Sequence, residues 1–356
     1  MTGESSNPKW FQRLRLEMLG RKPIRIHDSA SHDQQYKLRQ TLSGFLPTAP
    51  RAIGKDIAGV GYTGNHLIYF NSAPPAEKLL PDGTDELHSP GEPFVRRMWA
   101  GGSVRVNLAR YFGDEDFHGW KNDVRYVCIE RIKDVQLRGQ GDEAKIFVNI
   151  ERRIASMERL LASANDAKVS WYEVQEKSFE EDTHKGDGKG GNSMLVEERN
   201  LVFMQERSDA ELAAIKTGEI PPIKYLKAPG NPDFRYTLTP TSSLLSRFSA
   251  LTFNAHAIHL DREYCRTVEG HRNLLVHGPL TLMLMTKFIA TRLSQFVCNG
   301  YPATIAAIEY KNLAPLYCDE PMKLCARERE SHIEGGYIYD VWIEGPTGGV
   351  AVKGTV

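Results

Sequence analysis

The sequence predicts an α+β protein made of two similar halves, each an antiparallel sheet wrapped around a central helix. Three observations support this prediction. Strand-like runs dominate both halves of the chain, one long helix is apolar on most sides, and a proline-rich segment separates the halves. The 356 residues suit two domains of roughly 150 residues, because a domain of that size buries its own core.

The first half begins with a helix and continues with long strands. Residues 31–46 place Tyr36, Leu38, Leu42 and Phe45 at helical spacing, and Pro47 ends the segment. A connection rich in proline and glycine follows. Strands are then expected at SVRVNLA, RYVCIERIKDVQL, AKIFVNIERRI and SMLVEERNLVFM. The polar, glycine-rich residues 179–192 are expected to form a loop or a flexible insertion.

The second half repeats this order. A short strand, FRYTLT, precedes a turn or helix from Thr241, and a polar loop leads to a long helix. Pro279 suits the first turn of that helix, and Asn299-Gly300 is expected to end it. Because LTLMLMTKFIATRLSQFV is apolar on most sides, the helix must be enclosed. The runs TIAAIEYKNLA, MKLCARERE, YIYDVWIEG and GVAVKGTV can curve around it as strands. Two such units make a double hot-dog fold.

The most proline-rich segment between the halves, PPIKYLKAPGNPD, is the best candidate for a linker. We therefore predict an N-terminal extension at residues 1–30, a degenerate hot-dog domain at 31–227 and a catalytic hot-dog domain at 228–356. The extension holds a possible amphipathic piece, WFQRLRLEML, but Glu4 and Glu17 do not suit a mitochondrial presequence. Mitochondrial and cytoplasmic locations both stay open.

Charge and cysteine content narrow the possible partners. Lysine plus arginine and aspartate plus glutamate number 45 each, so no field of one sign would attract nucleic acid or an anionic membrane. The most apolar run is interrupted by Lys287 and Arg292, so no membrane span is expected. The five cysteines lack metal-like spacing, and we expect free thiols in a reducing compartment with no metal and no other cofactor.

The stretch FNAHAIHLDREY, residues 253–264, concentrates the residues suited to proton transfer. Adding water to an unsaturated acyl thioester needs a group that both takes and gives a proton, and N–H donors that polarise the thioester carbonyl. His259 suits the first task because the histidine pKa lies near neutrality. The Gly278 N–H, at the start of the long helix, suits the second. Asn254 can hold a water molecule or hydroxyl group, or form a turn, but cannot take a proton.

At these residues the chain resembles the MaoC-like hydratases and dehydratases, most closely their double hot-dog branch of type 2 hydroxyacyl-thioester dehydratases and mesaconyl-CoA hydratase-like proteins. FSALTFNAHAIHLD aligns with the catalytic motif without gaps. FVRRMWAGGSV, EGHRNLLVHGPL, EYKNLAPLYCDEP and DVWIEGPTGGVAVKGTV resemble the branch in the same order, so the resemblance covers residues 31–356. It implies that His259 is the catalytic histidine and that Asn254 replaces the aspartate of the wider family, as is usual in this branch.

Two departures from the branch concern the residues beside His259. The branch often carries arginine and tyrosine where this chain has Ala257 and Leu260. The resemblance therefore implies that these two positions affect which acyl group fits or how the thioester carrier is held. Of the neighbouring polar residues, we expect His256 to be structural and Asp261 to cap the next helix.

Three further residues have two interpretations each. Arg96 and Arg97, in RRMWAGG, could hold a phosphate of CoA or phosphopantetheine as forked donors, or could pair the two halves structurally. His277 could line the substrate pocket or make a hydrogen bond at the start of the long helix.

Together these features predict a cofactor-independent lyase that reversibly hydrates or dehydrates C2–C3 of an acyl thioester carried by CoA or an acyl carrier protein. Within this class the candidates are a fatty 3-hydroxyacyl dehydratase, a short dicarboxylyl-CoA hydratase and a tailoring dehydratase of a biosynthetic pathway. A non-catalytic thioester- or partner-binding hot-dog protein is the alternative from another class. The N-terminal half, which has no IHxD motif, is expected to widen the acyl tunnel. Monomer and homodimer both stay open.

Overall fold

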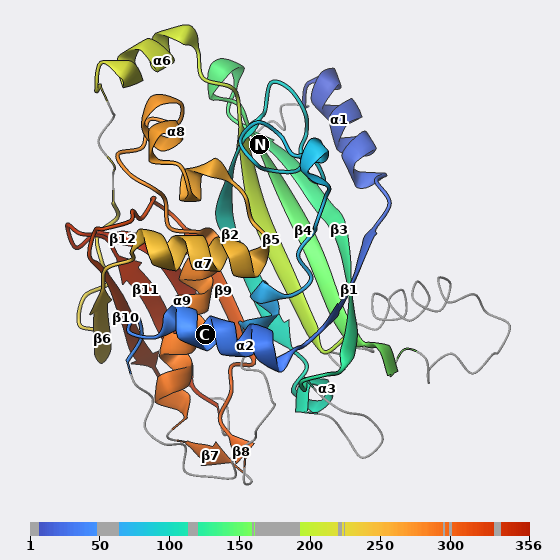
Figure 1. Cartoon of the computed structure of the whole chain (residues 1–356), viewed down its shortest axis with the longest axis vertical. Helices are drawn as coiled ribbons and strands as arrows, with labels where there is room; N and C mark the ends of the chain where they lie inside the picture. Colours follow the sequence, from blue (N-terminus) through green and yellow to red (C-terminus); the bar gives the residue numbers. More distant parts are fainter. Residues whose placement is uncertain are drawn as a thin grey trace, which may run out of the picture.

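The computed structural model describes residues 7–47, 64–112, 120–158, 160, 193–219, 223, 225–294, 296–298, 301–330 and 336–356. Within these residues the main feature is one antiparallel sheet of ten strands (Figure 1). The strand order is β1-β3-β4-β5-β2-β9-β12-β11-β10-β6. The two predicted sheets are therefore joined edge to edge into a single curved layer.

The two halves of the sheet have matching topology. The N-terminal half contains β1 (Ile24–Ser29), β2 (Arg96–Val106), β3 (Arg125–Arg138), β4 (Lys145–Ser156) and β5 (Leu195–Met204). The C-terminal half contains β6 (Phe234–Leu238), β9 (Ala307–Asn312), β10 (Met322–Arg329), β11 (Ile338–Glu344) and β12 (Val350–Thr355). Each half follows the same internal order outward from the central β2–β9 pair. This repeat confirms the predicted α+β double hot-dog class.

The junction between the halves depends on two glycines of β2. A Cβ added to Gly101 would lie 2.4 Å from the carbonyl oxygen of Tyr310, and one on Gly102 would lie 1.9 Å from that of Glu198. A side chain at either position would separate β2 from a neighbouring strand. The AGG sequence therefore permits β2 to pair with β9 and β5 at the same time.

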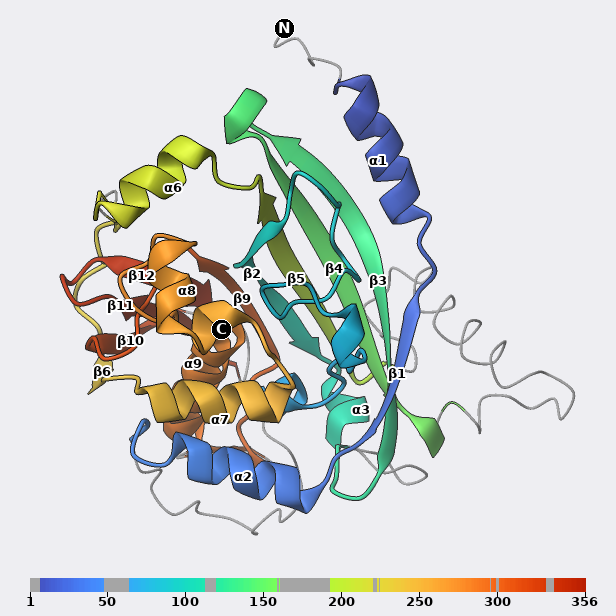
Figure 2. The same cartoon turned by 45° about the horizontal axis from the view of Figure 1, so that its top comes forward.

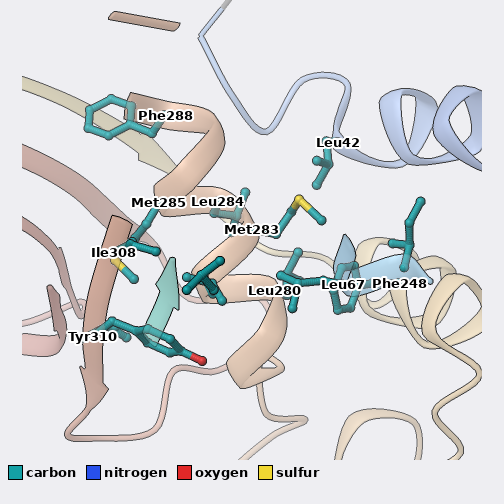
Figure 3. Close-up of a cluster of buried hydrophobic side chains, with 14 of the residues drawn as sticks. Leu42, Leu67, Phe248, Leu280, Met283, Leu284, Met285, Phe288, Ile308 and Tyr310 are labelled. Atoms are coloured by element: carbon teal, nitrogen blue, oxygen red, sulfur yellow. The ribbon is translucent and has the colours of Figure 1, made fainter. Parts of the chain in front are cut away.

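Helix α9 (Gly278–Leu293) runs along the concave face of the C-terminal half. Figure 3 shows its apolar side chains between Ile308 and Tyr310 of β9 and residues Leu42, Leu67 and Phe248 from other elements. The helix is enclosed, as its apolar sequence predicts, and it begins at the expected place. It ends at Leu293, earlier than predicted, because β7 (Val297–Cys298) pairs with β8 (Tyr301–Pro302). Residues 299–300 lie outside the described residues.

Helices α2 (His32–Leu42) and α7 (Ser242–Thr252) lie side by side across the open side of the sheet (Figure 2). Ser31 and Thr241 cap them, each accepting a hydrogen bond from a backbone N–H in the first turn. Each helix follows the first strand of its half, so they are equivalent in the repeat. Residues 64–95, in contrast, contain only the short 3-10 turns η1 (Asn65–Ile68) and η2 (Ala76–Lys78) and no counterpart of α9. The central helix is confirmed for the C-terminal half alone.

The remaining elements are peripheral. They are α1 (Lys9–Leu19), α3 (Leu108–Phe112), α6 (Asp209–Lys216), α8 (Arg262–Thr267) and the 3-10 turns η3 (Gly141–Glu143) and η4 (Ala257–His259). Helix α1 packs near β3 through buried Phe11 and Met18, and Arg15 pairs with Asp134. Residues 24–29 of the predicted extension form the edge strand β1, whereas the predicted loop at 179–192 lies outside the described residues. The boundary near residue 228 stays a prediction. No described helix is long and apolar enough to cross a membrane.

A buried ionic network occupies the concave face of the N-terminal half. Arg152, with 0% of its surface exposed, lies 2.8 Å from both Glu130 and Glu197. Burial alone would raise the pKa of Glu130, but the hydrogen bond with His88 and the charge of Arg152 lower it to about 2. The pKa of Glu197 is also lowered, because Arg199 and Arg152 outweigh its burial. These carboxylates are therefore charged in the folded protein.

Arg152→Met should destabilise the fold strongly. Removing this cation leaves Glu130 and Glu197 buried with fewer partners, which typically costs about 3–5 kcal/mol. Chemical denaturation of Arg152→Met should show this loss of unfolding free energy. Arg131→Met is the matched control, because Arg131 is 43% exposed and Glu151 keeps Arg153 beside it. We expect that control to lose less than about 1 kcal/mol. Equal losses in the two variants would contradict the structural role of Arg152.

Candidate active site

The loop from Phe253 to Asp261 joins α7 to α8 and carries the predicted catalytic residues. Phe253 takes a left-handed conformation (φ 51) that ends α7. The Asn254 Oδ1 accepts a hydrogen bond from the His256 N–H at 2.9 Å, which forms an Asx-turn. Asp261 accepts hydrogen bonds from the N–H groups of Glu263 and Tyr264 and so caps α8, as the sequence predicts.

His259 lies at the cavity wall with its imidazole in a defined tautomer. Its Nδ1 is 2.8 Å from the carbonyl oxygen of Leu275. Because a carbonyl oxygen only accepts hydrogen bonds, Nδ1 carries the proton and Nε2 keeps a lone pair. Burial lowers the pKa of His259 to about 4, although the hydrogen bond to Leu275 opposes this shift. At neutral pH the side chain is thus an uncharged base.

Asn254 forms the Asx-turn of one interpretation, and its role in holding a water molecule or hydroxyl group stays a prediction. The N–H of His256 can only donate, so the side-chain atom that it meets is the oxygen. The Nδ2 group remains as a donor, and Asn254 lines the cavity. The Asx-turn therefore orients the side chain and leaves the Nδ2 group as a donor for a water or hydroxyl oxygen.

Gly278 forms the first residue of α9 and lies at the junction of the halves. A Cβ there would be 2.8 Å from the Cβ of Trp99 and 2.9 Å from the Nδ2 of Asn312. Glycine is required because these side chains approach its backbone so closely. Among the described residues none accepts a hydrogen bond from its N–H. The N-terminal end of α9 therefore offers a donor and a favourable dipole to a developing oxyanion.

His277 lies behind His259 and does not line the cavity. It is fully buried, and its ring stacks on that of His259 with centroids 3.6 Å apart and planes at 21°. Its Nε2 is 2.8 Å from the Ser249 Oγ on α7. Burial and the neighbouring His259 and His256 lower the pKa of His277, so it too is uncharged. Of its two interpretations, the structural one agrees with this geometry.

The site opens into a cavity of about 390 Å³ between the two halves. Asn254, His256, His259 and Gly278 line it from the C-terminal half. The N-terminal half contributes apolar and charged residues from its strands and from the turns that replace a second central helix, namely Leu67, Phe70, His88, Trp99, Glu130, Ile150, Arg199 and Leu201. Both halves are therefore needed to form the site.

The two predicted arginines have different surroundings. Arg96 holds the Oε2 of Glu269 through its Nε at 3.0 Å and its Nη2 at 2.8 Å. This pair joins the N-terminal half to the C-terminal half, as the structural interpretation expects. Arg97 lines the cavity and donates to the carbonyl oxygen of Asp85 at 3.2 Å.

Ala257 and Leu260 are not in the cavity wall. The backbone N–H of Ala257 donates to the carbonyl oxygen of Asp82 at 2.8 Å, and Leu260 is 45% exposed on the outer surface of the loop. Their effect on acyl selection or on the hold of the thioester carrier stays a prediction.

Sequence reasoning missed the loop that supports the catalytic residues from the other half. Asp82 Oδ2 lies 3.4 Å from the Nε2 of His256. A Cβ on Gly83 (φ +80) would be 2.2 Å from the carbonyl oxygen of Ala255. The residues PDGT are typical of a turn, but no local pattern indicates which distant segment the turn contacts. No group of three or more histidine, cysteine or carboxylate side chains in the described residues could hold a metal ion.

Comparison of the fold with solved structures identifies its class. A MaoC-like dehydratase superimposes with a TM-score of 0.58 at 11% identity, covering 94% of this chain and 95% of that one. A Mycobacterium tuberculosis protein described as having a double hot-dog fold gives a TM-score of 0.52 at 10% identity, over 94% and 95% of the two chains. At such low identity these similarities establish the double hot-dog fold alone.

Sequence comparison identifies the family. Residues 64–318 match the family model described as hydroxyacyl-thioester dehydratase type 2, and the chain belongs to this family. It is 33% identical over 293 residues to the mesaconyl-C(4)-CoA hydratase of Chloroflexus aurantiacus, covering 82% of this chain and 81% of the relative. It is 25% identical over 297 residues to the mitochondrial hydroxyacyl-thioester dehydratase type 2 of Schizosaccharomyces pombe, covering 82% and 86%.

The pH dependence of catalysis should reflect the buried state of His259. Because its pKa is lowered to about 4, the imidazole stays a free base while the pH falls through 6.5. We expect kcat/KM for an enoyl thioester to stay nearly constant over that range and to fall as the pH approaches about 4. Short assays that finish before acid unfolding would measure this limb. An acid limb centred near 6.5 would show that His259 is not buried as described.

His277 should act on catalysis through packing against His259. In His277→Ala, water should enter behind His259, raise its pKa toward the ordinary value and let the ring move. We expect kcat to fall roughly 10- to 100-fold, since small misplacements of catalytic groups have effects of this size, and the acid limb to shift upward. His277→Phe keeps a flat ring at the same place and should retain most activity. If the Phe variant lost as much as the Ala variant, packing would not be the role of His277.

Proposed function

We propose that the protein reversibly adds water across C2–C3 of a 2-enoyl thioester, with His259 as the only acid/base residue. The observation that carries this proposal is the arrangement of one unprotonated imidazole nitrogen, one amide donor and one helix N-terminus around a single cavity. The family to which the chain belongs supports the same reaction class.

In the hydration direction, His259 Nε2 takes a proton from a water molecule as the water oxygen bonds to C3. Asn254 Nδ2 donates a hydrogen bond to one lone pair of that water oxygen, and the other lone pair of the oxygen points at C3. The C2–C3 π electrons move to form an enolate, and its oxygen receives the hydrogen bond from the Gly278 N–H. The proton on Nε2 then passes to C2, which restores the thioester and the neutral imidazole.

Dehydration follows the same path in reverse. His259 takes the C2 proton, and the enolate forms opposite the Gly278 N–H. The C3 hydroxyl leaves as water after it receives the proton from Nε2. Because Asn254 can only donate to the hydroxyl oxygen, it stabilises the charge that develops there without taking a proton. One imidazole thus serves both proton transfers, which matches the absence of a second proton carrier at position 254.

The N-terminal half is proposed to hold the acyl group. Residues 64–95 form short turns instead of a central helix, and the cavity extends into this space. The thioester carrier is CoA or an acyl carrier protein, and Arg97 is a cavity-lining cation that could bind it. Two relatives named as mitochondrial support a mitochondrial location, with the cytoplasm as the alternative.

Substitution of His259 tests the proposal. His259→Ala should reduce hydration of crotonyl-CoA by at least about 100-fold, because general acid–base catalysis contributes that much or more. The measurement is the loss of enoyl-thioester absorbance, with circular dichroism to verify the fold. His271→Gln is a suitable control, because His271 is a partly buried histidine whose pKa is also lowered to about 4, mainly by burial, but it lies outside the cavity wall.

Undiminished turnover in His259→Ala would refute the assignment. A non-catalytic thioester-binding protein would instead bind the CoA ester without incorporating solvent deuterium at C2. Measuring both binding and exchange in the wild-type protein separates this case from a true hydratase.

A further inference from the structure

The acyl end of the cavity contains an arginine that the proposed reaction does not use. Arg199, on β5, lines the cavity and directs its Nε to the Oε1 of Glu197 at 2.8 Å. Its guanidinium carbon lies 4.9 Å from the centre of the Trp99 ring. These two contacts fix the guanidinium group in one plane.

Arg199 has N–H donors that make no hydrogen bond within the ionic network. Arg152 supplies the fully buried cation between Glu130 and Glu197. In the described part of the chain, no acceptor lies within hydrogen-bond distance of the two terminal NH₂ groups of Arg199. Because a guanidinium group only donates, these groups require an acceptor oxygen in the cavity.

Trp99 connects this arginine to the reaction centre. Its Cβ approaches the backbone of Gly278, and its ring packs against Arg199. The indole is held by a hydrogen bond of 2.6 Å from its Nε1 to the hydroxyl of Tyr310. The Gly278 N–H and the guanidinium group of Arg199 are therefore separated by about the length of one indole ring. This separation suits a short acyl group.

We propose that Arg199 binds a carboxylate at the far end of a short acyl group, so that the substrate is the thioester of a dicarboxylic acid. This inference rests on the proposed function and specifies its substrate class. A carboxylate matches the parallel N–H bonds of a fixed guanidinium group. An alkyl chain in the same place would exclude water from Arg199 and Glu130. It would offer these groups no hydrogen bonds in return, which is unfavourable.

A comparison of matched substrates tests this inference in the wild-type protein. The substrates are the CoA thioesters of pent-2-enoic to oct-2-enoic acid and their counterparts in which a carboxyl group replaces the terminal methyl group. We expect kcat/KM to be at least about 10-fold higher for the carboxyl-ended member of the shortest pairs, since 1.4 kcal/mol of binding free energy corresponds to a factor of ten. The advantage should shrink as the chain lengthens.

Variants of Arg199 assign the preference to this residue. Arg199→Met should lose the preference for the carboxyl-ended substrate by at least about 10-fold, measured as the ratio of kcat/KM for the two substrates within the same variant. Arg199→Lys should restore part of the preference through its charge. Arg131→Met, which removes an arginine of β3 that lies outside the cavity wall, should leave the ratio unchanged.

The outcomes separate the two proposals. Hydration of methyl-ended substrates at equal or higher kcat/KM than their carboxyl-ended counterparts would overturn the role of Arg199 and leave the hydratase assignment intact. Hydration of neither series would overturn the proposed function itself. If Arg199→Met does not fold, the wild-type ratio and the Arg199→Lys variant still decide, because lysine keeps a positive charge beside Glu197.

Discussion

The pairing of β2 with β9 is the constraint on which the rest of the structure depends. It joins the two half-sheets at Gly101 and Gly102, and it places Trp99 of the N-terminal half against Gly278 and Asn312 of the C-terminal half. The Nδ2 of Asn312 donates to the carbonyl oxygen of Trp99 at 2.8 Å, which fixes this contact. The proposed oxyanion donor, the tryptophan beside it and the wall of the proposed acyl site thus share one boundary. A shift of one half relative to the other would disturb all three.

The difference between the halves has a simple physical consequence. In the C-terminal half, α9 fills the concave face with mainly apolar side chains, and its buried Lys287 donates a hydrogen bond to Asn65 of the N-terminal half. In the N-terminal half, residues 64–95 provide turns, and the concave face carries Arg152, Glu130 and Glu197. A buried ionic network is weak support for stability when compared with an apolar core. Its retention beside a cavity is understandable where the cavity binds a polar ligand.

The sequence predicted the elements well because their signals are local. Strand runs, caps such as Thr241 and Asp261, and the enclosed helix all depend on residues near one another in the chain. The end of α9 was predicted too late, because pairing of Val297–Cys298 with Tyr301–Pro302 outweighed the Asn-Gly signal. The absence of a second central helix from residues 64–95 was not predicted. The strands of the first half match those of the second half, which suggested a matching helix. The segment before these strands has no sequence pattern of its own that would indicate otherwise.

The candidate catalytic residues were identified from a motif, but the contacts that hold them in place were not predicted. The link from Asp82 and Gly83 to the catalytic loop joins segments more than 170 residues apart, and nothing in either segment specifies it. The inward positions of Glu130, Arg152 and Glu197 follow from strand alternation, yet charged residues in long strands usually indicate a solvent-exposed face. Arg96 is a similar case, because the sequence offers no partner for it until Glu269 is brought near by the fold.

Burial of His259 links catalysis to stability. The same burial that keeps the imidazole unprotonated lowers its pKa to about 4, and His66 and His271 have pKa values lowered to about 4 as well. In the unfolded chain these histidines titrate near 6.5, so below that pH the unfolded state binds more protons than the folded state. The stability that each contributes is fully present above pH 6.5 and is lost as the pH falls toward 4, with a slope of up to about 1.4 kcal/mol per pH unit for each histidine. The burial that keeps His259 unprotonated at neutral pH therefore also lowers the stability of the fold in acid.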